Sequence, residues 1–169
     1  MDTDALYKTM LMKLLSLSKE PLSTSVITDF FSKKNYTNYF TVQKDLYELK
    51  EQGLIDSREE FSRTYYSLTK AGSTALSSLS DWITRDILSD IESYLLENKR
   101  EIRADSSLGA SYDATVAGFL VRLTKAVNDT KVIDLTFPAP TKEAAENICL
   151  NWKSHSEEAI DALYESLIR

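Results

Sequence analysis

Residues 41–53 have the sequence TVQKDLYELKEQG, in which apolar side chains recur at helical spacing. Val42, Leu46 and Leu49 fall on one side of such a helix, and that side is expected to be buried. Gly53 follows at the point where helices commonly end in the left-handed conformation that glycine adopts most easily. The pattern predicts an amphipathic helix over residues 41–52 with one buried face and one outward face.

Two helices are expected before this one. Residues 4–18 carry leucine and methionine at helical spacing, with Asp4 as the expected N-terminal cap and Pro21 beyond the end. A second helix is expected from about residue 23, and Lys33-Lys34-Asn35 has the composition of a turn. The apolar residues that this second helix is expected to bury are Val26, Ile27, Phe30 and Phe31.

A β-hairpin and a closing helix are expected after residue 53. Residues 54–58 and 64–68 have strand character with polar residues between them, and residues 69–79 form a further helical segment. Three helices, a hairpin and a closing helix in this order are typical of a winged helix-turn-helix. We therefore expect a winged-helix domain of the DNA-binding type over residues 1–80.

Residues 81–169 are expected to form a second, smaller α+β domain that serves dimerisation and possible sensing. Its predicted order is helix–β-hairpin–helix–helix. The predicted elements are a long helix from about residue 82, a loop at 106–109, strands at 112–125 and 132–137, a helix capped by Thr141 and a last helix capped by Ser156. The last helix is expected to bury Ile160, Leu163 and Leu167.

Charge is distributed unevenly along the chain. The net charge is −6, from 20 basic and 26 acidic residues. Residues 1–80 hold ten of each and sum to zero, so the whole excess of acid lies in residues 81–169. This balance argues against indiscriminate binding to nucleic acid, although it leaves a neutral first domain free to bind DNA specifically.

The sequence also predicts the cellular compartment of the protein. No run of eighteen apolar residues is present, and the acidic start at Met1-Asp2-Thr3-Asp4 is unlike a signal peptide. The single cysteine, Cys149, has no internal disulfide partner, which suits a reducing environment. We expect a cytoplasmic protein that does not enter a membrane.

The outward face of residues 41–52 supplies the main candidates for DNA contact. Lys44 can meet phosphate or guanine, Gln43 can pair with adenine, and hydroxyl groups can reach phosphates. The alternative is a plain solvated helix face, which Glu48 and Glu51 favour. The full set of DNA-binding candidates is Tyr36, Asn38, Thr41, Gln43, Lys44, Tyr47, Arg58 and Arg63.

Two groups of candidates flank this helix. Tyr36 and Asn38 lie in an aromatic and amide-rich turn, where contact with the DNA backbone and simple packing are equally consistent with the sequence. If the helix begins at Asn38, Phe40 projects outward; otherwise the helix starts at Thr41. Arg58 and Arg63 flank the hairpin tip and could enter a minor groove, but the acids at residues 59 and 60 favour an ordinary exposed hairpin.

Little in the sequence supports catalysis. Cys149 lies on an apolar helix face and is expected to pack in a core, and His155 lies beside serines with no cluster of ligands. Only four glycines are present and none forms a phosphate-binding loop. We expect no enzyme, no cofactor, no catalytic residue and no metal site.

Several segments together resemble a known family. They are 35–41, 64–72, 97–102, 132–135 and 145–153, in order and over nearly the whole chain. They are similar to a bacterial winged-helix family described as a domain of unknown function and grouped loosely with PadR-like and MarR-like transcriptional regulators. The resemblance implies a transcriptional regulator and supplies no catalytic residue.

The leading hypothesis is a homodimeric regulator that binds double-stranded DNA, with recognition helices about 34 Å apart if the site is palindromic. Because Val116 and Leu120 would fall on the outer face of the second hairpin, we expect the flanking helices to cover it and a partner chain to extend or bury it. The second hypothesis is a winged-helix protein-interaction module without DNA binding. A third is a sensor with a pocket for a small-molecule effector between Phe119, Phe137 and the helices; the alternative, which is favoured, is a filled core, and the sequence does not identify an effector.

Overall fold

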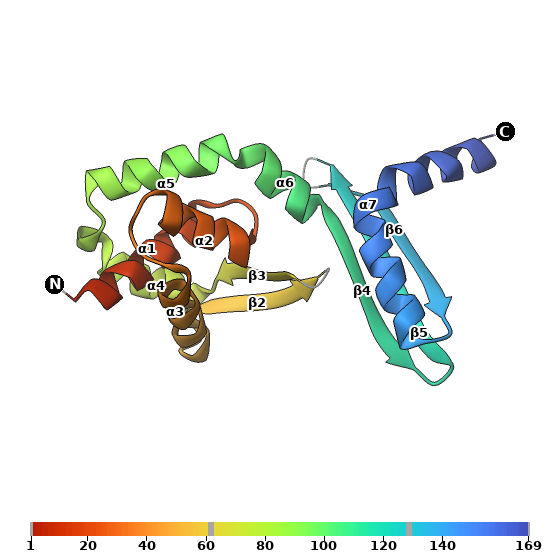
Figure 1. Ribbon diagram of the computed structural model, residues 1–169, viewed down its shortest axis with the longest axis horizontal. Helices are drawn as coiled ribbons and strands as arrows, with labels where there is room; N and C mark the ends of the chain where they lie inside the picture. The colour runs from red at the N-terminus through yellow and green to blue at the C-terminus, as the bar shows by residue number, and fades with distance from the viewer. Residues whose placement is uncertain (1, 61–62, 128–129, 169) are drawn as a thin grey trace. The chain divides into compact units, whose positions relative to one another are not determined.

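The computed structural model describes residues 2–60, 63–127 and 130–168, and for residues 60 and 104–106 it describes the backbone alone. The chain folds as two compact units, residues 1–106 and 107–169, each with one small sheet (Figure 1). The fold is mixed α+β, as expected. No helix in the described residues is both long and apolar enough to cross a membrane.

The first unit contains six α-helices and a three-stranded antiparallel sheet in its described residues. The strands are β1 (Leu22–Ser23), β2 (Ile55–Glu60) and β3 (Arg63–Leu68), in the order β1-β3-β2. The helices are α1 (Thr3–Leu17), α2 (Thr24–Lys33), α3 (Tyr39–Glu51), α4 (Lys70–Ser78), α5 (Arg85–Glu97) and α6 (Lys99–Ser107), with a short 3-10 turn η1 (Ser80–Trp82). The three helices, hairpin and closing helix occur in the order that the sequence predicted.

Helix starts in this unit follow from local side-chain chemistry. Ser23, Asn38 and Thr69 each accept a hydrogen bond from a backbone N–H of the first turn that follows. The first helix differs from expectation, because its cap is Asp2, which accepts from the N–H of Asp4. The carboxylate of Asp4 is therefore left free to bind lysines.

One core joins α1, α2, α3 and α5. Phe30 and Phe31 are fully buried at its centre with their rings 5.1 Å apart, edge to face. The helix α5 adds Ile91 and Tyr94, and the Tyr94 hydroxyl donates to the carbonyl of Val26 at 2.8 Å. The division of the chain thus falls after residue 106, and not near residue 80, because α5 completes the core of the first unit.

The second unit is a three-stranded meander covered on one face by a single long helix. Its elements are β4 (Leu108–Thr115), β5 (Gly118–Val127), β6 (Thr130–Ala139) and α7 (Lys142–Leu167), with sheet order β4-β5-β6. The expected strand over 112–125 is in fact two strands that turn at residues 116–117. Gly118, at φ +129°, makes that turn possible, and the sequence pattern did not reveal it.

Helix α7 is continuous, whereas two helices were expected. Thr141 caps it as predicted, accepting from the N–H of Ala144 at 3.1 Å. Ser156 does not cap a new helix, because it lies buried in the middle of α7 and no glycine or proline interrupts residues 142–167. The indole N–H of Trp152 donates to the carbonyl of Thr124 at 3.0 Å and fixes the helix on the sheet.

The last turns of α7 extend past the strands (Figure 1). Leu163 is 37% exposed and Leu167 is 78% exposed, so the expectation that this stripe is buried within the chain is wrong. The opposite face of the sheet is also open: Leu120 is 43% exposed there, beside the ion pair of Arg122 with Asp134, whereas Val116 lies in the exposed turn between β4 and β5. Helix α7 covers one face only, so the end of α7 is an apolar surface without a partner among the described residues.

Candidate nucleic-acid interface

Helix α3 packs against the core of the first unit through the apolar stripe that the sequence predicted. Val42, Leu46 and Leu49 are each 1% exposed. The Asn38 carboxamide oxygen accepts from the N–H of Thr41 at 3.1 Å and from its hydroxyl at 3.4 Å. Asn38 and Thr41 thus cap the helix start, and the opposite side of α3 faces outward.

Aromatic side chains dominate that outward side. Phe40 is 80% exposed, Tyr47 66% and Tyr39 51%, and the Tyr39 and Phe40 rings lie 5.7 Å apart. Because α3 begins at Tyr39, Phe40 is presented outward, which decides between the two alternatives left by the sequence. Singly exposed aromatics are ordinary, but three on one helix form a surface suited to contact another molecule.

Lys44, the main basic candidate, is not an isolated cation. Its Nζ lies 2.7 Å from a carboxylate oxygen of Asp4 and 3.9 Å from one of Glu48. Lys8 on α1 bridges the same two acids, 2.5 Å from each. Two lysines and two carboxylates therefore form a neutral network, which joins the start of α1 to the middle of α3 and which we call the α1–α3 ion network.

The charge states in this network are well defined. Hydrogen bonds from Lys44 and Lys8 lower the pKa of Asp4 from 3.8 to about 2, so Asp4 is ionised at neutral pH. Hydrogen bonds to Asp4 raise the pKa of both lysines. The Lys44 side chain is 55% exposed, so a DNA phosphate can reach its ammonium group, where it competes with the Asp4 carboxylate.

A buried carboxyl group lies beside the network. Asp45 is 1% exposed, and its Oδ1 finds no hydrogen-bond partner among the described residues. Burial, and next the nearby charge of Asp4, raise the pKa of Asp45 from 3.8 to about 6. Oxygens of Asp4, Asp45 and Glu48 lie within 4.8 Å of one another, but Lys8 and Lys44 already pair with Asp4 and Glu48, and we interpret the group as structural.

Two further candidates are directed away from the outward face. The Nε2 of Gln43 is buried without a partner among the described residues, so this amide is not presented for base contact. The Tyr36 hydroxyl donates to Asp90 at 2.6 Å, and its ring packs against Phe30 and Phe31. Of the two interpretations of Tyr36, the structure supports packing.

The β2–β3 hairpin carries the remaining candidates on exposed positions. Arg58 lies opposite Tyr65, with its guanidinium carbon 5.8 Å from the centre of that ring. Arg63 lies opposite Glu60 in the register. The tip at residues 61–62 is outside the described residues, so the choice between an ordinary exposed hairpin, which the sequence favours, and entry into a minor groove stays a prediction.

Sequence reasoning missed the part of the ion network that lies on α1, namely Asp4, which pairs with Lys44, and Lys8, which pairs with the same two acids. Asp4 is forty positions from Lys44 along the chain, and Lys8 is one helical turn after Asp4, so no local pattern connects them to α3. It also missed the burial of Asp45. The helical spacing placed this residue next to the apolar stripe, and that was the one available signal.

The residues weighed for catalysis have ordinary surroundings. Cys149 is buried as expected, and burial raises the pKa of its thiol, which keeps it protonated. His155 is exposed, with Nδ1 3.4 Å from a carboxylate oxygen of Glu158. Neither side chain lies in a described group of reactive residues.

Comparison with known proteins gave one result. Searches of curated proteins and of solved structures found no match. A family model did match, over residues 7–168 and thus across both units. The expected relationship to PadR-like and MarR-like regulators stays a prediction, and the chain belongs to the family described as a domain of unknown function, DUF4364.

Proposed function

We propose that this protein is a cytoplasmic transcriptional regulator that binds double-stranded DNA through a winged helix, as a homodimer. The observation that carries the proposal is the setting of α3. Its apolar stripe is buried, its opposite side is uncovered, and a β-hairpin follows it directly. A major groove is wide enough for one such helix, and an adjoining hairpin can contact the backbone beside it.

The contacts in this proposal follow from what α3 presents. Tyr47 and Thr41 offer hydroxyl groups to phosphates, and Lys44 exchanges its pairing with Asp4 for pairing with a phosphate. Arg58 and Arg63 sit on the hairpin within the same unit. Because the α1–α3 ion network is neutral, nonspecific affinity is expected to be low and contact geometry to supply most of the specificity.

Substitution of the two partners in the ion network should change DNA affinity in opposite directions. Lys44→Ala should weaken binding about tenfold near 0.1 M salt and reduce the salt slope by about one, since one phosphate contact is lost. Asp4→Asn should strengthen binding, because it removes the carboxylate that competes for Lys44. Both are measured by fluorescence anisotropy of a selected duplex at several salt concentrations.

The matched control for Asp4→Asn is Asp81→Asn, which makes the same charge change at an exposed acid on η1. It should leave affinity nearly unchanged. If both asparagine variants strengthen binding equally, the effect comes from net charge and the role given to Lys44 is wrong.

The end of α7 is the surface that we assign to the second copy. Ile160, Leu163 and Leu167 recur at spacings of three and four, the pattern of a seam between like helices. Asp161 and Glu165 lie on the other side of the helix, so two copies can approach along the seam without facing like charges.

Substitution within the seam should therefore yield monomers. The double variant Leu163→Glu, Leu167→Glu places charge in the seam at positions that are exposed in the single chain, so the fold is retained. We expect sedimentation at tens of micromolar to show dimers for the unaltered chain and monomers for the variant. Leu150→Glu, at another exposed leucine of α7, should stay dimeric. An unaltered chain that sediments as a monomer contradicts the assignment.

A protein-interaction module is the second candidate, and a specific observation favours it. The exposed rings of Tyr39, Phe40 and Tyr47 are accompanied by a lysine whose charge is already neutralised. Such a surface resembles the aromatic centre of a protein interface more than a phosphate-binding helix. Phe40→Ser separates the candidates, because it should abolish protein binding while reducing DNA affinity only slightly.

A further inference from the structure

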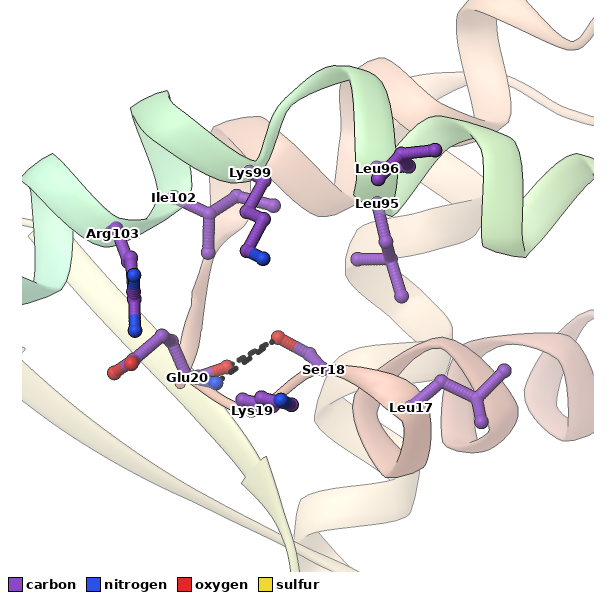
Figure 2. Close-up of a pocket in the computed structure, with 9 residues that line it drawn as sticks. All are labelled: Leu17, Ser18, Lys19, Glu20, Leu95, Leu96, Lys99, Ile102 and Arg103. Atoms are coloured by element: carbon purple, nitrogen blue, oxygen red, sulfur yellow. Dashed lines mark hydrogen bonds between the residues drawn. The ribbon is translucent and has the colours of Figure 1, made fainter. Parts of the chain in front are cut away.

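A cavity of about 240 Å³ that is open to solvent lies at the surface of the first unit (Figure 2). On one side are the end of α1 and the turn that follows it, and on the other is the junction of α5 with α6. The lining residues are Leu17, Ser18, Lys19, Glu20, Leu95, Leu96, Lys99, Ile102 and Arg103.

The apolar part of the lining is entirely aliphatic. Ile102 is buried, and Leu95 and Ile102 point from the two helices toward the turn after α1 (Figure 2). Leu17 lies at the α1 edge of the cavity and is exposed. No aromatic ring of the described residues lines the cavity, so it is suited to a flexible hydrocarbon chain more than to a flat ring.

The charged part of the lining is predominantly basic. Lys19, Lys99 and Arg103 contribute three positive charges against the single negative charge of Glu20. Neither Lys19 nor Lys99 forms an ion pair with any residue in the described ranges, and the Lys99 ammonium points into the cavity (Figure 2). The hydroxyl of Ser18 is occupied, because it donates to the carbonyl of Glu20 at 2.6 Å. The two lysines are therefore the groups available to an anion.

We propose that this cavity binds a medium-chain aliphatic carboxylate, with the hydrocarbon chain against Leu95 and Ile102 and the carboxylate at Lys99 and Lys19. At roughly 30 Å³ for each chain carbon or water molecule, the volume holds about eight such groups. The positive rim selects an anionic head group, and the aliphatic lining selects the chain. This inference does not depend on DNA binding.

The position of the cavity gives binding a physical consequence. Lys99, Ile102 and Arg103 belong to α6, the last helix before the second unit begins at residue 107. A bound carboxylate contacts both this helix and the end of α1, and so links the two. Binding should therefore reduce amide hydrogen exchange in α6 and raise the melting temperature of the chain in proportion to ligand concentration.

The test is calorimetric titration of the full chain with sodium octanoate, octan-1-ol and sodium acetate. A ligand of this size is expected to bind with a Kd near or below about 1 mM. Octan-1-ol should bind at least about tenfold more weakly because it lacks the charge, and acetate should not bind measurably because it lacks the chain. Octan-1-ol binding as tightly as octanoate, or octanoate not binding at low millimolar concentration, overturns the proposal.

Two variants locate the binding site. Lys99→Met keeps the side-chain stem and should weaken octanoate about tenfold, whereas Lys50→Met, which alters an exposed lysine in the last turn of α3, should change nothing. Leu17→Trp should block binding by filling the cavity, with circular dichroism confirming that the variant is folded. In methyl NMR, octanoate should shift the resonances of Ile102 and Leu95. Unchanged affinity in both cavity variants would assign the binding to another place and refute the site.

Discussion

Replacing Gly72 with alanine is expected to destabilise the first unit by about 3 kcal/mol or more. A Cβ at this position would lie 2.0 Å from the carbonyl oxygen of Leu54 and 2.6 Å from a methyl carbon of Leu68. The clash involves backbone that cannot give way easily, because the Leu54 carbonyl also accepts from the N–H of Thr69. The start of α4 can therefore pack against the hairpin only without a side chain at residue 72.

Gly53→Ala is the matched control. Gly53 has a φ of +71°, and a Cβ added there would have no atom within 4 Å, so alanine meets conformational strain without a clash. The expected loss is about 1 kcal/mol. Urea titrations followed by circular dichroism measure the free energy of unfolding of both variants. Equal losses would show that α4 does not pack closely on Leu54.

Asp45→Asn is expected to stabilise the protein at pH 7 by about 1–2 kcal/mol. The carboxylate is buried with an oxygen that lacks a partner among the described residues, and its pKa of about 6 exceeds the ordinary value of 3.8. Folding therefore favours the protonated form of the Asp45 carboxyl group. The stability that this protonated group contributes is fully present below pH 3.8 and is lost as the pH rises through 6. Asparagine does not titrate and avoids this loss.

The prediction has a distinct pH profile. The advantage of Asp45→Asn over the unaltered chain should be small at pH 4 and grow until about pH 7. Urea titrations of both proteins at several pH values from about 4 to 7 give the free energies of unfolding from which this difference is calculated. Asp86→Asn, which changes an exposed acid on α5, should show no such growth. A pH-independent difference, or a loss of stability at pH 7, would mean that Asp45 is ionised without penalty in the folded protein.

The features of α3 that sequence alone predicted are those determined by neighbouring residues. The spacing of Val42, Leu46 and Leu49 determines which side is buried, because 3.6 residues make one turn. The cap at Thr141 is predicted equally well, since a cap depends on a side chain and the first turn that follows it. In both cases the neighbouring residues alone were sufficient to predict the feature.

What the sequence did not reveal depends on residues far apart in the chain. The partner of Lys44 is Asp4 on α1, and the cavity joins residues 17–20 to residues 95–103. The sequence likewise did not indicate that α5 completes the first core, because an amphipathic stripe shows that a face is buried without showing what covers it. For the same reason the sequence could not decide between packing and DNA contact for Tyr36, whose partner Asp90 lies on α5.

The most direct test of the central claim, that α3 binds DNA, is in-vitro selection of bound duplexes from a random pool. The selected duplex is then titrated with the unaltered chain and with the double variant Lys44→Ala, Tyr47→Ala, whose altered side chains are exposed. We predict enrichment of a palindromic sequence with half-sites about 34 Å apart and affinity at least about thirtyfold lower for the folded double variant. A pool that shows no enrichment, or a double variant that binds as tightly as the unaltered chain, would contradict the claim.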